Sequence, residues 1–75
     1  MNKIADTRKR FAISQAQLVK KLGWKQSRLS NYENGLRSLS VKDAEKIVTA
    51  LQELGAKTSF REVFLQTNDL VDSLA

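Results

Sequence analysis

Residues 15–35 read QAQLVKKLGWKQSRLSNYENG, and the rest of the chain is best understood outward from them. Apolar side chains recur there at helical spacings of three or four residues, at Leu18, Leu22, Leu29 and Tyr32. Gly23 separates the two pairs, and a residue that tolerates positive φ lets the backbone leave one helix and enter another within a few residues. Trp24 then supplies an apolar wedge between the two axes. The stretch therefore predicts two short helices joined by a tight turn.

The second of these helices keeps a polar outward face. With the apolar pair turned inward, the side chains left over are Gln26, Ser27, Arg28, Ser30 and Asn31. Such groups suit base edges in a major groove, because Gln and Asn pair with adenine, Arg pairs with guanine, and Ser pairs with either. The alternative is a solvated helix face, which usually carries more Lys and Glu. We expect bases to be read by Gln26, Ser27, Arg28 and Asn31.

These features resemble the helix-turn-helix of the phage Cro and repressor class, which is also found in restriction-control proteins and antitoxins. The resemblance covers residues 4–54 and rests on Gln15, which opens the first helix, on the turn glycine, and on Glu33-Asn34-Gly35, which closes the second helix. It implies an all-α, lambda-repressor-like domain of five or six helices. The motif would span residues 15–34 of a single domain that covers residues 1–75.

The resemblance also implies roles for individual residues. An ion pair between Arg8 and Glu33 would tie the N-terminal segment to the second helix of the motif, the recognition helix that enters the major groove. Gln15 would brace Gln26. Contacts to the DNA backbone are implied for Gln15, Lys25, Asn34, Arg37, Ser38 and Lys42. The alternative for Arg37 is entry into the minor groove. The alternative for Arg8 and Glu33 is two unrelated surface charges.

Composition narrows the function classes. A chain of 75 residues has a small core that dimerisation would help to stabilise. It contains no cysteine and no histidine, so thiolate metal ligands and the commonest catalytic base are missing. No apolar run approaches about 20 residues and no signal-peptide pattern opens the chain. We therefore expect a cytoplasmic protein that is not an enzyme, with no catalytic residues, cofactor, metal or membrane association.

The net charge of +5 is unevenly distributed. Residues 1–46 hold eleven Lys or Arg and four acidic residues, a balance of +7, whereas residues 47–75 hold two and four, a balance of −2. The basic part also contains the helix that is expected to read bases. This is the arrangement expected if phosphates supply much of the affinity for DNA.

The flanking segments are also predicted to be helical. A first helix is expected over residues 1–12. Ser14 with Gln17 forms a capping-box pattern before the second helix, and Ser40 is expected to cap a helix over residues 41–54. A further capping-box pattern, Ser59 with Glu62, precedes a fifth helix, although this run is also compatible with a β-strand.

The C-terminal segment 59–75 carries much apolar surface among its acidic residues. Part of the fifth helix and the following tail are expected to form a two-fold dimer interface through Phe64, Leu65, Leu70, Val71 and Leu74. Closure of the monomer's own core is the competing use. Residues 67–75 are expected to be a sixth short helix or a loose tail.

The expected function is sequence-specific binding of double-stranded DNA. The resemblance favours a Cro-like repressor of phage or prophage type that binds a pseudo-palindromic operator as a homodimer, with recognition helices about 34 Å apart. The alternative is the antitoxin of a toxin–antitoxin pair, in which the acidic, apolar C-terminal region binds a toxin partner and the same helix-turn-helix serves autoregulation.

Overall fold

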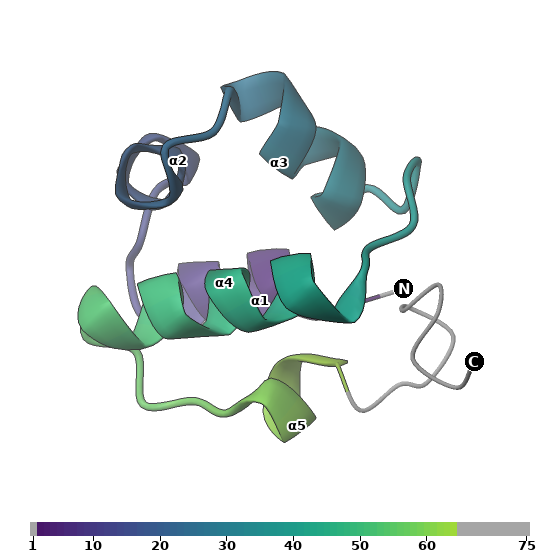
Figure 1. Cartoon of the computed structure of the whole chain (residues 1–75). Coiled ribbons are helices and arrows are strands. Elements are labelled where there is room, and N and C mark those ends of the chain that lie inside the picture. The colour runs from purple at the N-terminus through teal and green to yellow at the C-terminus, as the bar shows by residue number, and fades with distance from the viewer. Residues whose placement is uncertain (1, 65–75) are drawn as a thin grey trace.

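A computed structural model describes residues 2–64 of the chain. It contains five α-helices and no β-strand in that range, which confirms the all-α prediction (Figure 1). The helices are α1 (Ile4–Arg10), α2 (Gln15–Leu22), α3 (Gln26–Glu33), α4 (Val41–Glu53) and α5 (Phe60–Phe64). The sixth helix that the sequence suggested lies outside the described residues.

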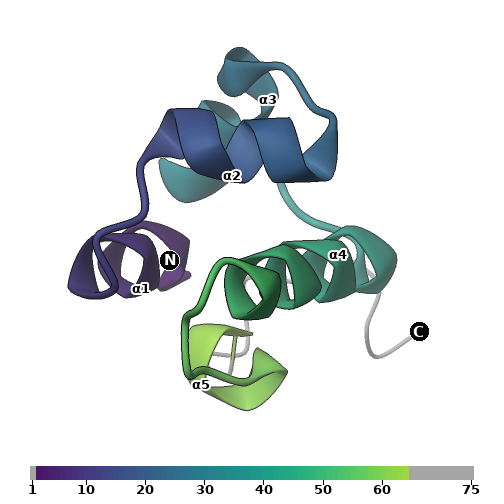
Figure 2. The ribbon, with the colours of Figure 1, turned by 90° about the vertical axis from the view of Figure 1, so that its left-hand side faces the viewer.

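The helices form three tiers. In Figure 1 α2 and α3 lie above α4, while α5 lies below it; Figure 2 shows α1 beside α4 in the middle tier. The closest packing follows this order, because α4 contacts α2 on one side and α5 on the other. The helix-turn-helix, α2 and α3, therefore rests on a platform made by α1 and α4.

The core lies between these tiers and draws on every helix. Its largest fully buried side chains are Ile4, Leu18, Leu29, Leu39, Ile47, Leu51 and Val63. Burying a side chain of this size stabilises the fold by about 1.5–3 kcal/mol. Since one of the seven comes from α3, the recognition helix is anchored by the same core that holds the rest of the fold.

The first helix is shorter than the sequence predicted. It runs over Ile4–Arg10, and the chain leaves the helical path at Phe11 because Ala12 has a positive φ of 58°. The backbone N–H of Ile13 then donates to the carbonyl of Arg8 at 2.8 Å, which closes the turn. Ile13 is buried beneath this turn, and the chain is redirected into α2.

Two of the predicted caps set where the central helices begin. The Ser14 hydroxyl accepts from the Gln17 backbone N–H at 3.0 Å while the Gln17 side chain accepts from the Ser14 backbone, so the capping box is confirmed. Ser40 caps α4 by accepting from the backbone N–H of Asp43 at 3.1 Å. At its other end α4 stops at Glu53, one residue before the predicted end, and Gly55 with φ of 102° turns the chain away.

The fifth element is a helix rather than a strand. The Ser59 hydroxyl accepts from the Glu62 backbone N–H at 3.3 Å and so supports the first turn of α5. Phe64, which the sequence placed at a dimer interface, is only 2% exposed in this chain and belongs to its core. The competing use, closure of the monomer's own core, therefore holds for Phe64. The other four predicted interface residues, Leu65, Leu70, Val71 and Leu74, lie outside the described residues.

No helix within residues 2–64 has both the length and the apolar character needed to cross a membrane.

Candidate nucleic-acid interface

The turn between α2 and α3 places the recognition helix, α3, against the core. Gly23 ends α2 with φ of 75°, and Lys25 in an extended conformation is the N-cap of α3. Trp24, between them, packs edge-on against Tyr32 with ring centroids 5.7 Å apart. Tyr32 and Leu29 are buried, so one face of α3 is fixed inward and the opposite face is left to solvent.

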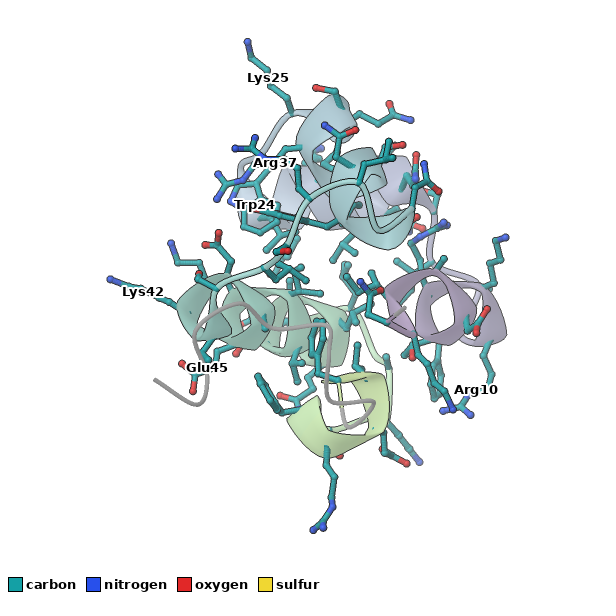
Figure 3. The ribbon with its side chains drawn as sticks, turned by 90° about the vertical axis from the view of Figure 1, so that its right-hand side faces the viewer. Arg10, Trp24, Lys25, Arg37, Lys42 and Glu45 are labelled. Atoms are coloured by element: carbon teal, nitrogen blue, oxygen red, sulfur yellow. The ribbon has the colours of Figure 1, made fainter. Side chains whose placement is uncertain are left out.

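The outward face of α3 carries the predicted base-reading side chains. Gln26 and Ser27, in the first turn, are exposed, and Arg28 and Asn31 are partly exposed. Figure 3 shows α3 at one end of the molecule, with Lys25 projecting from its start into solvent. The structure therefore presents these four side chains on a helix whose inner face is anchored by the core.

The last turn of α3 is tied to α1 by the ion pair that the resemblance implied. Arg8 Nε lies 2.9 Å from Glu33 Oε2, and Arg8 Nη2 lies 3.0 Å from Glu33 Oε1, so the pair is bidentate. The two side chains are 10% and 4% exposed. Arg8 also donates from Nη1 to the carbonyl of Ile13 at 3.2 Å. The pair thus fixes the end of the recognition helix on the α1–α2 junction.

A relay of two glutamines extends this pair to the start of α3. Gln15 Nε2 donates to Glu33 Oε1 at 2.9 Å, and Gln26 Nε2 donates to Gln15 Oε1 at 2.9 Å. The second contact is the predicted brace. The first was missed, because sequence reasoning gave Glu33 one partner, although a carboxylate can accept several hydrogen bonds.

The relay settles which way each amide points. An ionised carboxylate only accepts, so Gln15 must turn its nitrogen toward Glu33 and its oxygen toward Gln26. Gln26 must then donate to that oxygen from its own nitrogen. This leaves Gln26 with its carbonyl oxygen and one N–H, which is the acceptor and donor pair that matches the major-groove edge of adenine.

The first turn of α3 is tied to α4 by a second arginine, which sequence analysis had assigned only to base reading. Arg28 Nη2 lies 2.9 Å from Asp43 Oδ2, and the Arg28 guanidinium carbon lies 4.0 Å from the centroid of the Trp24 ring. The nearby Tyr32 hydroxyl raises the pKa of Arg28 above its ordinary value, as does Asp43, while partial burial opposes the rise. Arg28 therefore keeps its charge at this position.

The residues implied to contact the DNA backbone surround α3. Gln15 lies at the start of α2, Lys25 at the start of α3, and Lys42 in the first turn of α4, where Figure 3 shows it extending into solvent. The other three, Asn34, Arg37 and Ser38, are exposed in the segment that joins α3 to α4. That segment also holds Leu36, a large apolar side chain that is 73% exposed and that sequence analysis did not single out.

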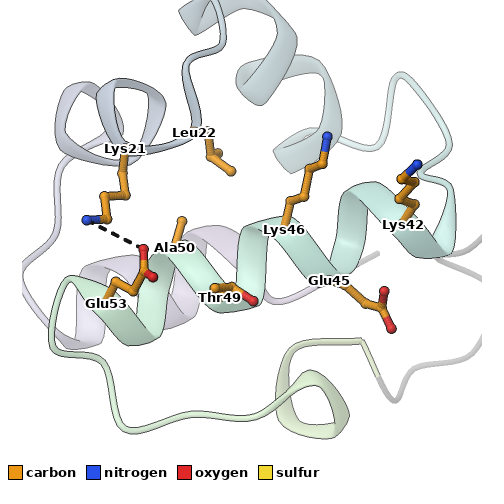
Figure 4. Close-up of a pocket in the computed structure, with 8 residues that line it drawn as sticks. All are labelled: Lys21, Leu22, Lys42, Glu45, Lys46, Thr49, Ala50 and Glu53. Carbon is orange, nitrogen blue, oxygen red and sulfur yellow. Dashed lines mark ion pairs between the residues drawn. The ribbon is translucent and has the colours of Figure 1, made fainter.

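A groove lies between α4 and α2, the first helix of the helix-turn-helix (Figure 4). Its lining residues are Lys21, Leu22, Lys42, Glu45, Lys46, Thr49, Ala50 and Glu53. Lys21 and Glu53 form an exposed ion pair across it, with Nζ 3.5 Å from Oε1. Charges of both signs line this groove, so it is less suited to a polyanion than the surroundings of α3.

Helices packed in this order, with a polar recognition helix presented at one end, define a DNA-binding domain of the helix-turn-helix class. The family model for the helix-turn-helix of Cro and C1 type matches residues 4–54. The chain therefore belongs to this family and is a DNA-binding transcription regulator. The search of curated proteins found no match to the chain, and neither did the search of solved structures.

Proposed function

We propose that the protein is a Cro-like repressor that reads a pseudo-palindromic operator through α3. The orientation of Gln26 carries this proposal. Its amide is held by the relay from Glu33 through Gln15, and the two groups left over suit adenine. A side chain held in its binding orientation loses less conformational freedom when it binds, which favours a specific contact over a solvated one.

Three more side chains complete the proposed base-reading set. Ser27 lies beside Gln26 in the first turn of α3, and Asn31 stands four residues after Ser27, one helical turn further along the same face. Arg28, held by Asp43, would read a guanine. Each well-made base contact contributes on the order of 1–3 kcal/mol of discrimination.

The surrounding polar and basic residues are proposed to position the protein on the phosphates. The set is Gln15, Lys25, Asn34, Arg37, Ser38 and Lys42. Contacts of this kind carry no sequence information, so losing one should weaken binding to every duplex alike.

We further propose that two copies bind together. An operator for a two-fold dimer presents half-sites about one helical turn apart, so that both recognition helices enter the major groove on one side of the duplex. Repression would follow from excluding polymerase at the occupied site. Because Phe64 lies in the core of its own chain, the interface must use other residues.

Selection of binding sites from random duplex DNA tests the proposal. We expect an inverted repeat whose half-sites lie about one helical turn apart. In a second selection, Gln26→Ala should lose the preference at one position of each half-site, whereas Thr49→Ala, an exposed change on α4, should reproduce the wild-type site. Salt-sensitive binding without any sequence preference would contradict the proposal and favour the antitoxin alternative, for which co-purification of a toxin is the positive test.

A further inference from the structure

We infer that Asp43 is a specificity-determining residue: it holds the guanidinium of Arg28 over the Trp24 ring, in the orientation in which Arg28 reads a guanine. The inference rests on the proposed function, because it assigns to α4 a part in the reading done by α3. Asp43 would not contact DNA itself. It would act through Arg28, as a positioning residue.

Two contacts in different directions define where the guanidinium lies. Its carbon stands 4.0 Å from the centroid of the Trp24 ring, so the indole limits the position of the group from one side. The 2.9 Å hydrogen bond from Nη2 to Asp43 Oδ2 restrains the group from a second direction. A guanidinium that lies over an aromatic ring and is hydrogen-bonded through one nitrogen has less freedom than a solvated one.

The carboxylate that provides this restraint is itself fixed. Asp43 is in the first turn of α4, where its backbone N–H donates to the Ser40 hydroxyl at 3.1 Å. Its Oδ2 also accepts from the Tyr32 hydroxyl at 3.2 Å, and its side chain is 19% exposed. The restraint on Arg28 is therefore transmitted from a capped helix rather than from a mobile surface side chain.

Arg28 keeps donors with which to bind a base. A guanidinium carries five N–H groups, and Asp43 engages Nη2 only. The Arg28 side chain is also 40% exposed, so donors that Asp43 does not engage can be reached from solvent. The bidentate arginine contact to guanine needs two donors, and the planar guanidinium keeps further N–H groups for it beyond the one that binds Asp43.

The neighbouring carboxylate has a second consequence, which separates this role from phosphate binding. Asp43 offsets the charge of Arg28, so the pair as a whole attracts phosphate weakly. An arginine that served only the DNA backbone would gain affinity for every duplex if that carboxylate were removed. A base reader positioned by that carboxylate would, in addition, lose its preference at one base pair.

The experiment uses the full chain and compares two substitutions that remove one negative charge from the same helix. Asp43→Ala removes the partner of Arg28, and Glu45→Ala, at an exposed position of α4, is the matched control. Binding sites are selected from random duplexes for each variant and for wild type. Affinities are then measured for the best site and for its single-base variants. Arg28→Lys, which keeps the charge but loses the planar fork, is measured in parallel.

We expect Asp43→Ala to reduce the preference at one base pair of each half-site by about tenfold, with the other positions unchanged. Arg28→Lys should reduce the sequence preference at the same base pair. Both charge-removing variants should bind scrambled duplex slightly more tightly and to a similar extent, because each removes one negative charge near DNA. Thermal unfolding should show that both remain folded.

Two results would overturn the inference while leaving the proposed function intact. One is an Asp43→Ala variant with the wild-type preference at every position, which would make the pair only a clamp between α3 and α4. The other is a change at a base pair different from the one that Arg28→Lys affects. If wild type itself selects no sequence, the proposed function fails together with the inference.

Discussion

The recognition helix is held at its two ends by arginine–carboxylate pairs of opposite character. At its last turn, Arg8 and Glu33 are 10% and 4% exposed and meet through two hydrogen bonds. At its first turn, Arg28 and Asp43 are 40% and 19% exposed and meet through one. The first pair joins α3 to α1, and the second joins α3 to α4.

The difference teaches that burial, more than the presence of an ion pair, decides what the pair can do. Two buried charges give back in desolvation much of what they gain from each other, but removing only one leaves the other uncompensated. A half-exposed pair is screened by solvent and salt and adds little to stability. The last turn of α3, with the buried pair Arg8–Glu33, is therefore suited to holding the helix in place. The first turn, with the half-exposed pair Arg28–Asp43, is suited to contacting a ligand.

The largest expected effect is at the buried pair. Arg8→Ala and Glu33→Ala should each lower the free energy of unfolding by about 3–5 kcal/mol, because each leaves an unpaired buried charge. The double variant should lose clearly less than the sum, as urea denaturation would show. Strictly additive losses would mean that the two residues are not coupled.

A single alanine variant at this pair could be too unstable to measure. Glu33→Gln then provides the second test, because the amide retains an acceptor for Arg8 and for Gln15 while removing the charge. We expect this variant to remain folded and to be less stable than wild type. A variant as stable as wild type would show that the negative charge of Glu33 is not needed at that site.

The next largest effect is expected from the loss of a base contact at the first turn of α3. Gln26→Ala should weaken binding to the selected operator by about 1–3 kcal/mol and leave the free energy of unfolding nearly unchanged, since Gln26 is exposed. Binding measured against single-base variants of the operator should show relaxed preference at one position. Equal weakening on all duplexes would assign Gln26 to the backbone instead.

A smaller effect is expected from breaking the half-exposed pair of Arg28 and Asp43. Arg28→Ala and Asp43→Ala should couple by about 1 kcal/mol or less in a double-mutant cycle of stability, and the coupling should shrink at high salt. Urea denaturation at low and high salt measures both quantities. A coupling as large as that of Arg8 and Glu33 would contradict the contrast between the two ends.

The smallest expected effect is at a single phosphate contact. Lys25→Ala should weaken binding to all duplexes alike and reduce the slope of log affinity against log salt by about 0.9, the value for one phosphate. Lys57→Ala, an exposed lysine in the segment between α4 and α5, is the matched control and should leave the slope unchanged. A change of base preference in the Lys25 variant would argue for a base contact.

Local patterns predicted much of this fold. Helical spacing, the Ser14 and Ser40 caps and the turn at Gly23 depend on residues close in sequence, and the structure confirms them. The early end of α1 was missed because alanine rarely adopts a positive φ, so the local sequence does not mark Ala12 as the point where the chain turns toward the buried Ile13.

Contacts across the fold were predictable only where the family resemblance supplied them. It implied Arg8 with Glu33 and Gln15 with Gln26, both of which the structure contains. Asp43 was not connected to Arg28, because the two residues are fifteen positions apart and nothing in the spacing marks them as partners. Only the angle between α3 and α4 brings them together.

Affinity measured across a range of salt concentrations, for the best selected duplex and for a scrambled duplex of equal composition, tests the central claim most directly. If α3 reads base edges, the selected duplex should bind at least about a thousandfold more tightly than the scrambled duplex. The difference between the two affinities should persist as rising salt concentration weakens both. If the two affinities coincide at every salt concentration, binding is purely electrostatic and α3 is not a reader of sequence.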